Sequence, residues 1–216
     1  MRLFVAVDLN ENVRRKLSQI QKELGSGGFD LKLVEPENLH LTLKFLGEVE
    51  ESTLESIDRE ISESVKGFHE FALHFEGIGY FGSERFVKVV WVGVKEGKED
   101  FIKLAESLDK RLSFIRKDEH EKSPHLTIAR VKSGRNVQEL AREVKALRDV
   151  KVGEVLVKEI KLKKSVLTPD GPIYSDVKVF PLVRKEGAVK TEGDQTREGV
   201  RGHLQASRRL HSRENG

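Results

Sequence analysis

The chain has 216 residues, enough to bury a substantial hydrophobic core, and it contains no cysteine. Disulfides, thiolate metal sites and a cysteine nucleophile are therefore excluded. Lys and Arg number 39 against 36 Asp and Glu, a net charge of +3, so any nucleic acid must be bound at a local site and not by the whole surface. No apolar run is long enough for a membrane span or a secretion signal, which predicts a cytoplasmic protein without membrane partners.

Alternating hydrophobic residues predict strands, and hydrophobic residues three and four positions apart predict helices. In chain order we expect a strand at 3–9, a helix at 11–24, strands at 31–34 and 39–46, a helix at 54–65, strands at 71–79 and 86–94, a helix at 99–114, a strand at 124–131, a helix at 137–147, and strands at 154–167 and 173–180. Several strands follow one another through short links, which require antiparallel pairing. The sequence therefore predicts an α+β fold with helices on the outer faces of antiparallel sheets, and not a doubly wound parallel sheet.

An internal repeat divides this predicted body in two. Residues 39–46 and 125–131 show the same pattern, and their histidines are 85 positions apart. Solenoid repeats recur every 20–50 residues, so this spacing favours a duplicated lobe. We expect two pseudo-symmetric lobes within residues 1–184.

The repeated pattern is His-x-Thr-x, at residues 40–43 and again at 125–128. Residues i and i+2 of a strand face the same side, so each copy presents an imidazole beside a hydroxyl while its aliphatic residues point into the core. Two such strands would face one another across a central cleft. One neutral imidazole can then remove a proton from an attacking hydroxyl while the other, protonated, donates to the leaving oxygen. This arrangement suits in-line attack at phosphorus.

Neighbouring polar residues fit the same chemistry. Thr42 and Thr127 can donate hydrogen bonds to the non-bridging oxygens, and Lys44 and Arg130 can offset the phosphate charge. A single strand histidine is more often a packed or surface side chain, but two copies with the same spacing make coincidence a poor explanation. A zinc site is less well supported, because two histidines without a third ligand leave the set incomplete. No metal or cofactor is expected.

Two longer segments resemble a known family. Residues 37–47 (Glu-Asn-Leu-His-Leu-Thr-Leu-Lys-Phe-Leu-Gly) and 123–130 (Ser-Pro-His-Leu-Thr-Ile-Ala-Arg) closely resemble the two signatures of the two-histidine phosphoesterases. The specific likeness is to the LigT-like RNA 2′,3′-cyclic phosphodiesterases, also called 2′-5′ RNA ligases. Residues 3–9 and 91–94 are similar to that family as well, and the resemblance covers about residues 1–182. It implies a two-lobed α+β fold with a V-shaped central cleft.

The resemblance also implies an activity. Family members open terminal 2′,3′-cyclic phosphates of RNA to 2′-phosphates without metal, and some join RNA ends reversibly through 2′-5′ linkages. By this likeness His40 would be the proton donor to the departing 3′-oxygen, and His125 the proton acceptor that activates water. The phosphate would be bound by four further side chains, Thr42, Thr127, Arg130 and Lys44. The expected partners are RNA ends, such as those of tRNA halves, and the protein is expected to be a monomer.

Two alternatives stay open. The same scaffold could be a non-catalytic module that binds RNA ends, with the His-Thr pairs as ligands only. The acid–base pair could also serve a phosphodiesterase that acts on 2′-5′ oligonucleotides or on cyclic ADP-ribose phosphates. Base preference depends on loops such as 79–86, and the sequence does not specify it.

The composition changes after Arg184. The body is rich in Lys and Glu and poor in Gln, Asn and Met, a bias similar to that of proteins from thermophiles. Residues 185–216 contain no aromatic residue and few aliphatic ones, and Arg replaces Lys as the main base. Such a segment cannot bury enough surface to offset its ordering entropy, which predicts a disordered tail. A short Arg-rich helix near 201–210 that contacts RNA is the alternative.

Overall fold

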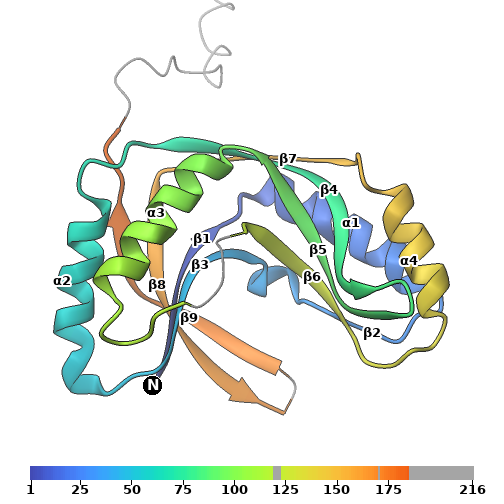
Figure 1. Cartoon of the computed structure of the whole chain (residues 1–216), viewed down its shortest axis with the longest axis horizontal. Coiled ribbons are helices and arrows are strands. Elements are labelled where there is room, and N and C mark those ends of the chain that lie inside the picture. Colours follow the sequence, from blue (N-terminus) through green and yellow to red (C-terminus); the bar gives the residue numbers. More distant parts are fainter. Residues whose placement is uncertain (119–122, 170, 185–216) are drawn as a thin grey trace, which may run out of the picture. The chain divides into compact units, whose positions relative to one another are not determined.

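A computed structural model describes residues 1–118, 123–169 and 171–184, shown in Figure 1. The predicted tail, 185–216, lies outside the described residues. The helices are α1 (Glu11–Ser26), α2 (Leu54–Val65), α3 (Lys98–Arg111) and α4 (Val137–Ala146), with short 3₁₀ turns η1 (Pro36–Asn38) and η2 (Glu51–Thr53). The strands are β1 (Arg2–Asp8), β2 (Leu31–Leu33), β3 (His40–Glu48), β4 (Phe71–Ser83), β5 (Phe86–Glu96), β6 (His125–Val131), β7 (Lys151–Val157), β8 (Glu159–Thr168) and β9 (Gly171–Pro181). No helix in these ranges is long and apolar enough to cross a membrane.

The strands form two antiparallel sheets, which confirms the predicted α+β class. Sheet A has the order β3-β1-β8-β9, and sheet B has the order β2-β6-β5-β4-β7. The single strand expected at 154–167 is wrong, because the chain changes sheets at Lys158. Strand β7 pairs with β4 in sheet B, whereas β8 pairs with β1 in sheet A. Hydrophobic alternation continues on both sides of Lys158, so no local signal marks the change of partner.

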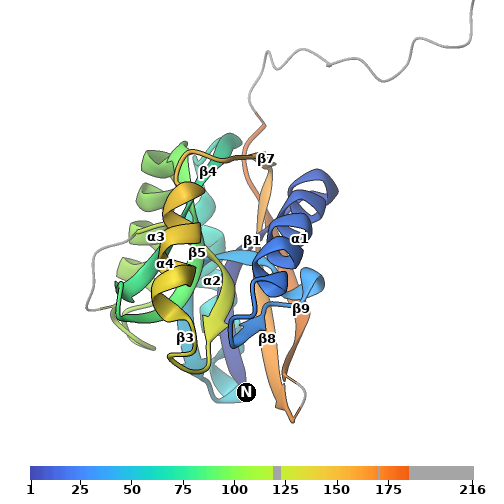
Figure 2. The same cartoon turned by 90° about the vertical axis from the view of Figure 1, so that its right-hand side faces the viewer.

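The two halves of the chain share one connection. In the first half β1 leads through α1 to its antiparallel neighbour β3, and in the second half β5 leads through α3 to β6. Each connecting helix contacts the sheet of the other half: α1 contacts β6 and β7, and α3 contacts β3. Figure 2 shows α1 and α4 from the side on which they cover sheet B. This exchange of helices joins the two halves into one folding unit.

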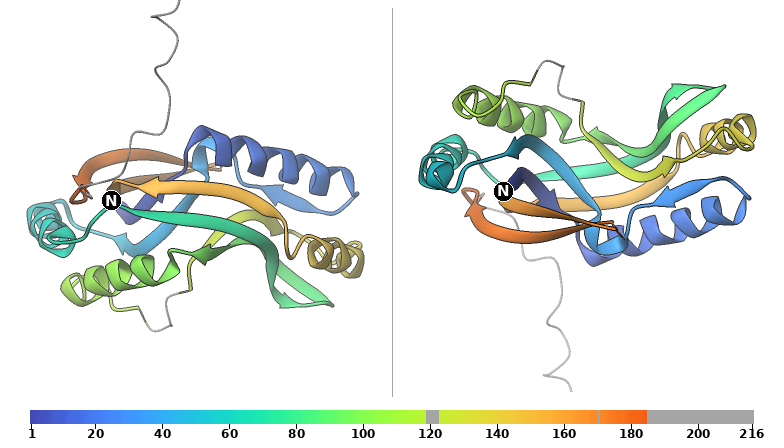
Figure 3. Two further views of the ribbon diagram at one scale, coloured as in Figure 1. Left: turned by 90° about the horizontal axis from the view of Figure 1, so that it is seen from above. Right: turned by 90° about the horizontal axis from the view of Figure 1, so that it is seen from below.

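The hydrophobic patterns explain why these helices form and which side they bury. In α1 the residues Val13, Leu17, Ile20 and Leu24 form one buried stripe, and the Asn10 side chain caps the helix by accepting from the Val13 amide at 2.9 Å. Buried side chains from both sheets and all four helices form one continuous core. Helices α2 and α3 lie at one end of residues 1–184, and α1 and α4 lie at the other (Figures 1 and 3).

Gly97 makes the sharp turn from β5 into α3. Its φ is +80°, a conformation that glycine adopts far more readily than other residues. A Cβ atom at this position would lie 1.9 Å from the carbonyl oxygen of Ala72, a backbone atom that cannot move aside. The sequence of this turn is therefore constrained both by conformation and by space.

We predict that Gly97→Ala lowers the free energy of unfolding by about 3 kcal/mol, from the strained backbone and the clash together. For a domain of this size the melting temperature should fall by roughly 6–12 °C. Gly134→Ala is the matched control, because a Cβ there meets no atom within 4 Å. Equal melting temperatures for the two variants, measured by calorimetry, would show that the turn is not constrained in this way.

Candidate active site

The two His-x-Thr-x segments form the first residues of two strands that contact each other. Strand β3 begins at His40 and β6 begins at His125, and the two strands meet between sheets A and B. In each strand the histidine and the threonine are half-buried, whereas the residues that follow them are buried in the core. The expected alternation is therefore present, and the structure brings the two motifs together.

Both motif strands contain a β-bulge immediately after the threonine. In β3, Thr42 pairs with Ala6 and Lys44 with Val5, so Leu43 has no partner of its own. In β6, Thr127 pairs with Trp91 and Ala129 with Val90, and Ile128 is the additional residue. A bulge places two successive side chains on the same side of a strand. In both strands the two residues after the threonine are thus buried.

Because of the bulge, Lys44 does not lie where the sequence pattern predicts it. This side chain is fully buried on the helix-facing side, where its ammonium contacts the carboxylates of Asp109 at 2.5 Å and Asp118 at 3.5 Å. It lies with the structural contacts of α3 and not beside the motif hydroxyls. Arg130 is three residues after its threonine, whereas Lys44 is only two residues after Thr42. Beyond the bulge in β6, Arg130 is therefore exposed on the same side of the strand as His125 and Thr127. Of the two basic residues, only Arg130 lies where a phosphate bound to the motifs could contact it.

Each motif histidine is oriented by a hydrogen bond to the backbone. Nδ1 of His40 lies 2.7 Å from the carbonyl oxygen of Asn38, and Nδ1 of His125 lies 2.8 Å from that of Ser123. A carbonyl oxygen can only accept, so Nδ1 carries the hydrogen in both rings. The neutral rings therefore hold an unprotonated Nε2, which can accept a proton, and the charged rings have an Nε2–H that can donate one.

Aromatic rings surround His40. The Phe4 ring lies 4.9 Å from the imidazole, and the Tyr174 ring lies edge-on to it at 5.3 Å. The side-chain amide of Asn38 also donates to the carbonyl of Pro172 at 2.9 Å, which ties the segment before β3 to the β8–β9 hairpin. The phenol of Tyr174 is near the positive charges of Arg130 and Arg2, which lower its pKa, although burial has the larger effect and raises it.

Tyr174 is a site residue that the sequence did not reveal. Its strand was predicted, but nothing in the sequence shows that sheet A curls so far that β9 approaches β3. The one available signal is that Tyr174 lies near the start of β9, next to Pro172. Within the described residues no hydrogen bond engages its hydroxyl, so this group is available to a ligand beside His40.

The surroundings of His125 are more open. Its hydrogen bond to Ser123 is exposed, and its one ring contact in the described part of the chain is with Phe81, edge-on at 4.8 Å. Phe81 also packs on Trp91 at 5.5 Å and is 40 % exposed. The two histidines therefore share the same backbone hydrogen bond but have unequal access to water.

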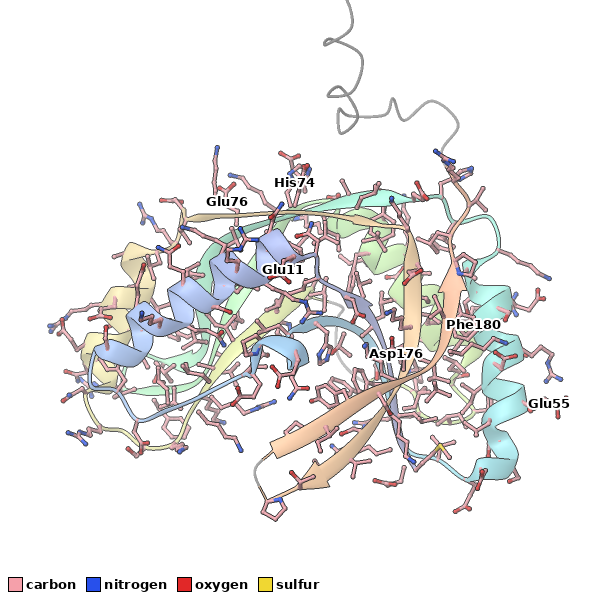
Figure 4. The ribbon with its side chains drawn as sticks, turned by 180° about the vertical axis from the view of Figure 1, so that it is seen from behind. Glu11, Glu55, His74, Glu76, Asp176 and Phe180 are labelled. Carbon is pink, nitrogen blue, oxygen red and sulfur yellow. The ribbon has the colours of Figure 1, made fainter. Side chains whose placement is uncertain are left out.

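A network of four charges lies beside His40. Lys161 and Lys163 of β8 each contact the carboxylates of Asp8 and Asp176, at distances from 2.5 to 3.0 Å. Asp176 is labelled in Figure 4. Burial alone would raise the pKa of both carboxyls, but hydrogen bonds from the two lysines outweigh it and hold both values below the usual range. Both carboxyls are thus charged at neutral pH.

The free protein favours the neutral form of His40. Burial is the main cause that lowers the pKa of this imidazole from 6.5, and the positive charges of Lys163 and Arg14 add to it. The hydrogen bond to the Asn38 carbonyl and the negative charge of Asp8 oppose the shift without cancelling it. A phosphate anion bound beside His40 would act in the same direction as Asp8 and raise the pKa.

The threonines complete the arrangement. Among the described residues no side-chain hydrogen bond involves the hydroxyl of Thr42 or Thr127, so both can donate to a ligand. No three His, Asp or Glu side chains within 1–118, 123–169 and 171–184 are grouped as metal ligands would be. The donors that converge here are two imidazoles, two hydroxyls and one guanidinium, a set that suits an anion with several oxygens.

Comparison with protein families agrees with this geometry. The model of the family described as LigT like Phosphoesterase matches twice, over residues 7–91 and 92–174. Each match contains one His-x-Thr-x segment, which confirms the internal repeat. An RNA 2′,3′-cyclic phosphodiesterase of Methanothermobacter thermautotrophicus is 44 % identical over 185 residues, covering 84 % of this chain and 99 % of that protein. One from Archaeoglobus fulgidus is 46 % identical over 182 residues, covering 83 % and 99 %.

Solved structures show the same fold. A crystal structure of a protein from Thermus thermophilus superposes with a TM-score of 0.72 at 30 % identity, covering 86 % of this chain and all of the other. The apo structure of E. coli LigT superposes with a TM-score of 0.65 at 24 % identity, covering 84 % and 97 %, a likeness that concerns the fold alone.

Replacing Lys44 tests its structural role. Lys44→Met should lower the free energy of unfolding by about 3 kcal/mol or more, because it leaves two carboxylates beside a buried apolar group. The exposed Lys66, which pairs with Glu63, provides the control: Lys66→Met should change stability by less than about 1 kcal/mol. Chemical denaturation of both variants measures the difference. A Lys44→Met protein as stable as the control would argue against this role.

Removing the positive charge of Lys163, which lowers the pKa of the His40 imidazole, should raise that pKa. In Lys163→Met the repulsion between the lysine and the imidazolium is lost. Asp8 also loses one of its two lysine partners, so its negative charge acts more strongly on the ring. Both changes favour the imidazolium. Arg14→Gln should act in the same direction. The pKa is read from an NMR titration of the His40 ring, with His40→Gln used to assign the signal. A pKa that falls or stays constant in Lys163→Met would refute this description of the site.

Proposed function

Since the chain belongs to the LigT-like phosphoesterases, we propose that it is an RNA 2′,3′-cyclic phosphodiesterase, which opens terminal cyclic phosphates to 2′-phosphates with His40 and His125 as its acid and base. The observation that carries this proposal is the pair of contacting motif strands, each holding an imidazole with Nε2 as its reactive atom. A single phosphate between them would meet a proton acceptor on one side and a proton donor on the other.

The proposed reaction proceeds by in-line displacement. Nε2 of neutral His125 accepts a proton from water as the water oxygen forms a bond to phosphorus. The bond from phosphorus to the 3′-oxygen breaks, and Nε2–H of charged His40 donates its proton to that oxygen. The products are a 2′-phosphate and a free 3′-hydroxyl. Thr42 and Thr127 donate to the non-bridging oxygens, and Arg130 offsets the added negative charge.

The exposure of the two histidines supports this division of roles. His125 is the more open ring, as a base that must reach water requires. His40 is enclosed by Phe4 and Tyr174, where a proton donor is protected from exchange with bulk water. Its lowered pKa favours the neutral form in the free protein, so the negative charge of the bound cyclic phosphate has to raise that pKa for His40 to act as the acid.

The same groups can serve ligation. When the 5′-hydroxyl of a second RNA replaces water, the attack on phosphorus forms a 2′-5′ phosphodiester and releases the 3′-hydroxyl. In the reverse direction the two histidines exchange their roles.

Incubation in EDTA of RNA that ends in a cyclic phosphate tests the proposed activity, with a 2′-phosphate as the expected product. No product, or product only after a metal is added, would overturn it.

The histidine roles can be separated by the leaving group. His40→Ala and His125→Ala should each reduce kcat/KM for cyclic-phosphate RNA by about a hundredfold or more, and the double variant should be little worse. On 3′-deoxyadenosine 2′-(4-nitrophenyl phosphate), the departing nitrophenolate needs no proton. His40→Ala should therefore keep most of its activity on this compound, whereas His125→Ala should lose it. The opposite pattern would exchange the two roles, and full activity of either variant on RNA would refute both.

The threonine hydroxyls are tested by Thr42→Val and Thr127→Val, which keep the shape of the side chain and remove one donor. A hydrogen bond to a charged phosphate contributes roughly 1.5–3 kcal/mol, so each variant should react about ten- to a hundredfold more slowly. Circular dichroism should show an unchanged fold. If both variants react at the rate of the parent protein, these hydroxyls have no part in binding the phosphate.

A further inference from the structure

A polar hollow lies outside the motif faces, between the β4–β5 turn and α4. Its volume is about 470 Å³. The residues that give it its character are Ser83, Glu84, Arg85, Gln138, Arg142 and Lys145. Three of these side chains are cationic and one is anionic. Most sites for uncharged small molecules are largely apolar, so this hollow suits a charged ligand with several acceptor oxygens.

The ion pairs of the cations in this hollow are exposed to solvent. Lys145 contacts Glu84 across the hollow, and Arg142 bonds to Glu139 of its own helix at 2.7 Å. Arg85 is exposed, and no ion pair engages it among the residues that the structure describes. Exposed ion pairs contribute little free energy, so a phosphate can replace these carboxylates at small cost. Guanidinium groups also bind phosphate through paired hydrogen bonds.

The hollow is a short distance from the candidate active site. Phe81 contacts the His125 ring, and Ser83 follows it by two residues on the same strand, about 7 Å further at the usual rise of a strand. Arg130, Val89 and Phe81 are aligned across β6, β5 and β4, so they form a line from the motif face toward the β4–β5 turn. A strand of RNA that leaves the active site along this line reaches the hollow within its first few nucleotides.

An exposed aromatic ring stands at the same turn. Phe86 pairs with Ser83 across the turn, and its side chain is 61 % exposed. Lys88 lies over the ring at 5.3 Å from its centre. Proteins that bind single-stranded nucleic acid combine such basic grooves with aromatic rings on which bases stack. An acidic peptide would use the cations but would have no use for the ring.

We propose that this hollow binds a backbone phosphate of the RNA upstream of its cyclic end, with Arg85, Arg142 and Lys145 as the phosphate contacts and Phe86 as a stacking surface for a base. The inference rests on the proposed function, because it treats the motif face as the place where the RNA terminates. With this contact, a protein whose net charge is only +3 would bind an RNA chain more tightly than a single cyclic nucleotide.

The test uses the full chain and two ligands: a fluorescent ten-nucleotide RNA with a 2′,3′-cyclic phosphate end, and 2′,3′-cyclic AMP. The triple variant Arg85→Gln/Arg142→Gln/Lys145→Gln should bind the RNA about tenfold or more weakly by fluorescence anisotropy. The slope of log affinity against log salt should decrease by about 0.7, as expected when one phosphate of a single strand is no longer neutralised. Hydrolysis of cyclic AMP should change by less than about twofold.

The control is a second triple variant, which loses the same number of positive charges at a site away from the hollow. Arg59→Gln/Lys66→Gln/Arg111→Gln removes three cations in or next to α2 and α3 that also pair with carboxylates. It should leave RNA binding within about twofold of the parent protein. Phe86→Ser should weaken RNA binding at least about fivefold, whereas Phe114→Ser, at a phenylalanine that is 55 % exposed, should not.

The outcomes separate this inference from the proposed function. Unchanged RNA binding in the hollow variant, or an equal loss in the control, overturns the inference even when cyclic AMP is hydrolysed normally. A parent protein that hydrolyses neither ligand overturns the proposed function, and the binding comparison still decides whether RNA occupies the hollow. Weaker hydrolysis of cyclic AMP in the hollow variant would also contradict the inference, because that ligand is too small to reach both places.

Discussion

The hydrogen bond from each motif histidine to the carbonyl two residues earlier determines what this site can do. It places the hydrogen on Nδ1 and leaves Nε2 as the reactive atom in both rings. The bond depends on the backbone path into β3 and β6, which is fixed in turn by the buried residues that alternate with the motif side chains. The same local structure thus occurs twice, and the contact between the two strands turns two copies into one site with an acid and a base.

The repeat is symmetric in its backbone and asymmetric in its surroundings. The exchange of α1 and α3 between the halves builds one core and keeps the motif strands together. Sheet A then encloses His40 with Phe4, Tyr174 and the charges of β8, whereas His125 contacts a single ring within the described part of the chain and its hydrogen bond is exposed. Duplication therefore supplies the two groups, and their different environments allow different roles.

Much of this could be predicted from the sequence, because hydrophobic alternation and the repeated motif are local. The fold class, the repeat and the meeting of the two motifs follow from such patterns. Three features do not. The bulge that turns Lys44 into the core depends on pairing with β1, the change of sheet at Lys158 depends on two different partners, and the approach of Tyr174 to His40 depends on the curl of sheet A. Each is set by contacts between distant segments.

The central claim is that His40 and His125 use Nε2 on the same phosphate. Long-range ¹H–¹⁵N NMR of the histidine rings, during titration with adenosine 2′-phosphate in EDTA, tests it most directly. Without ligand both neutral rings should carry hydrogen on Nδ1, and on titration both Nε2 signals should shift with one common Kd. A ring with its hydrogen on Nε2, or a response confined to one histidine, would contradict the account.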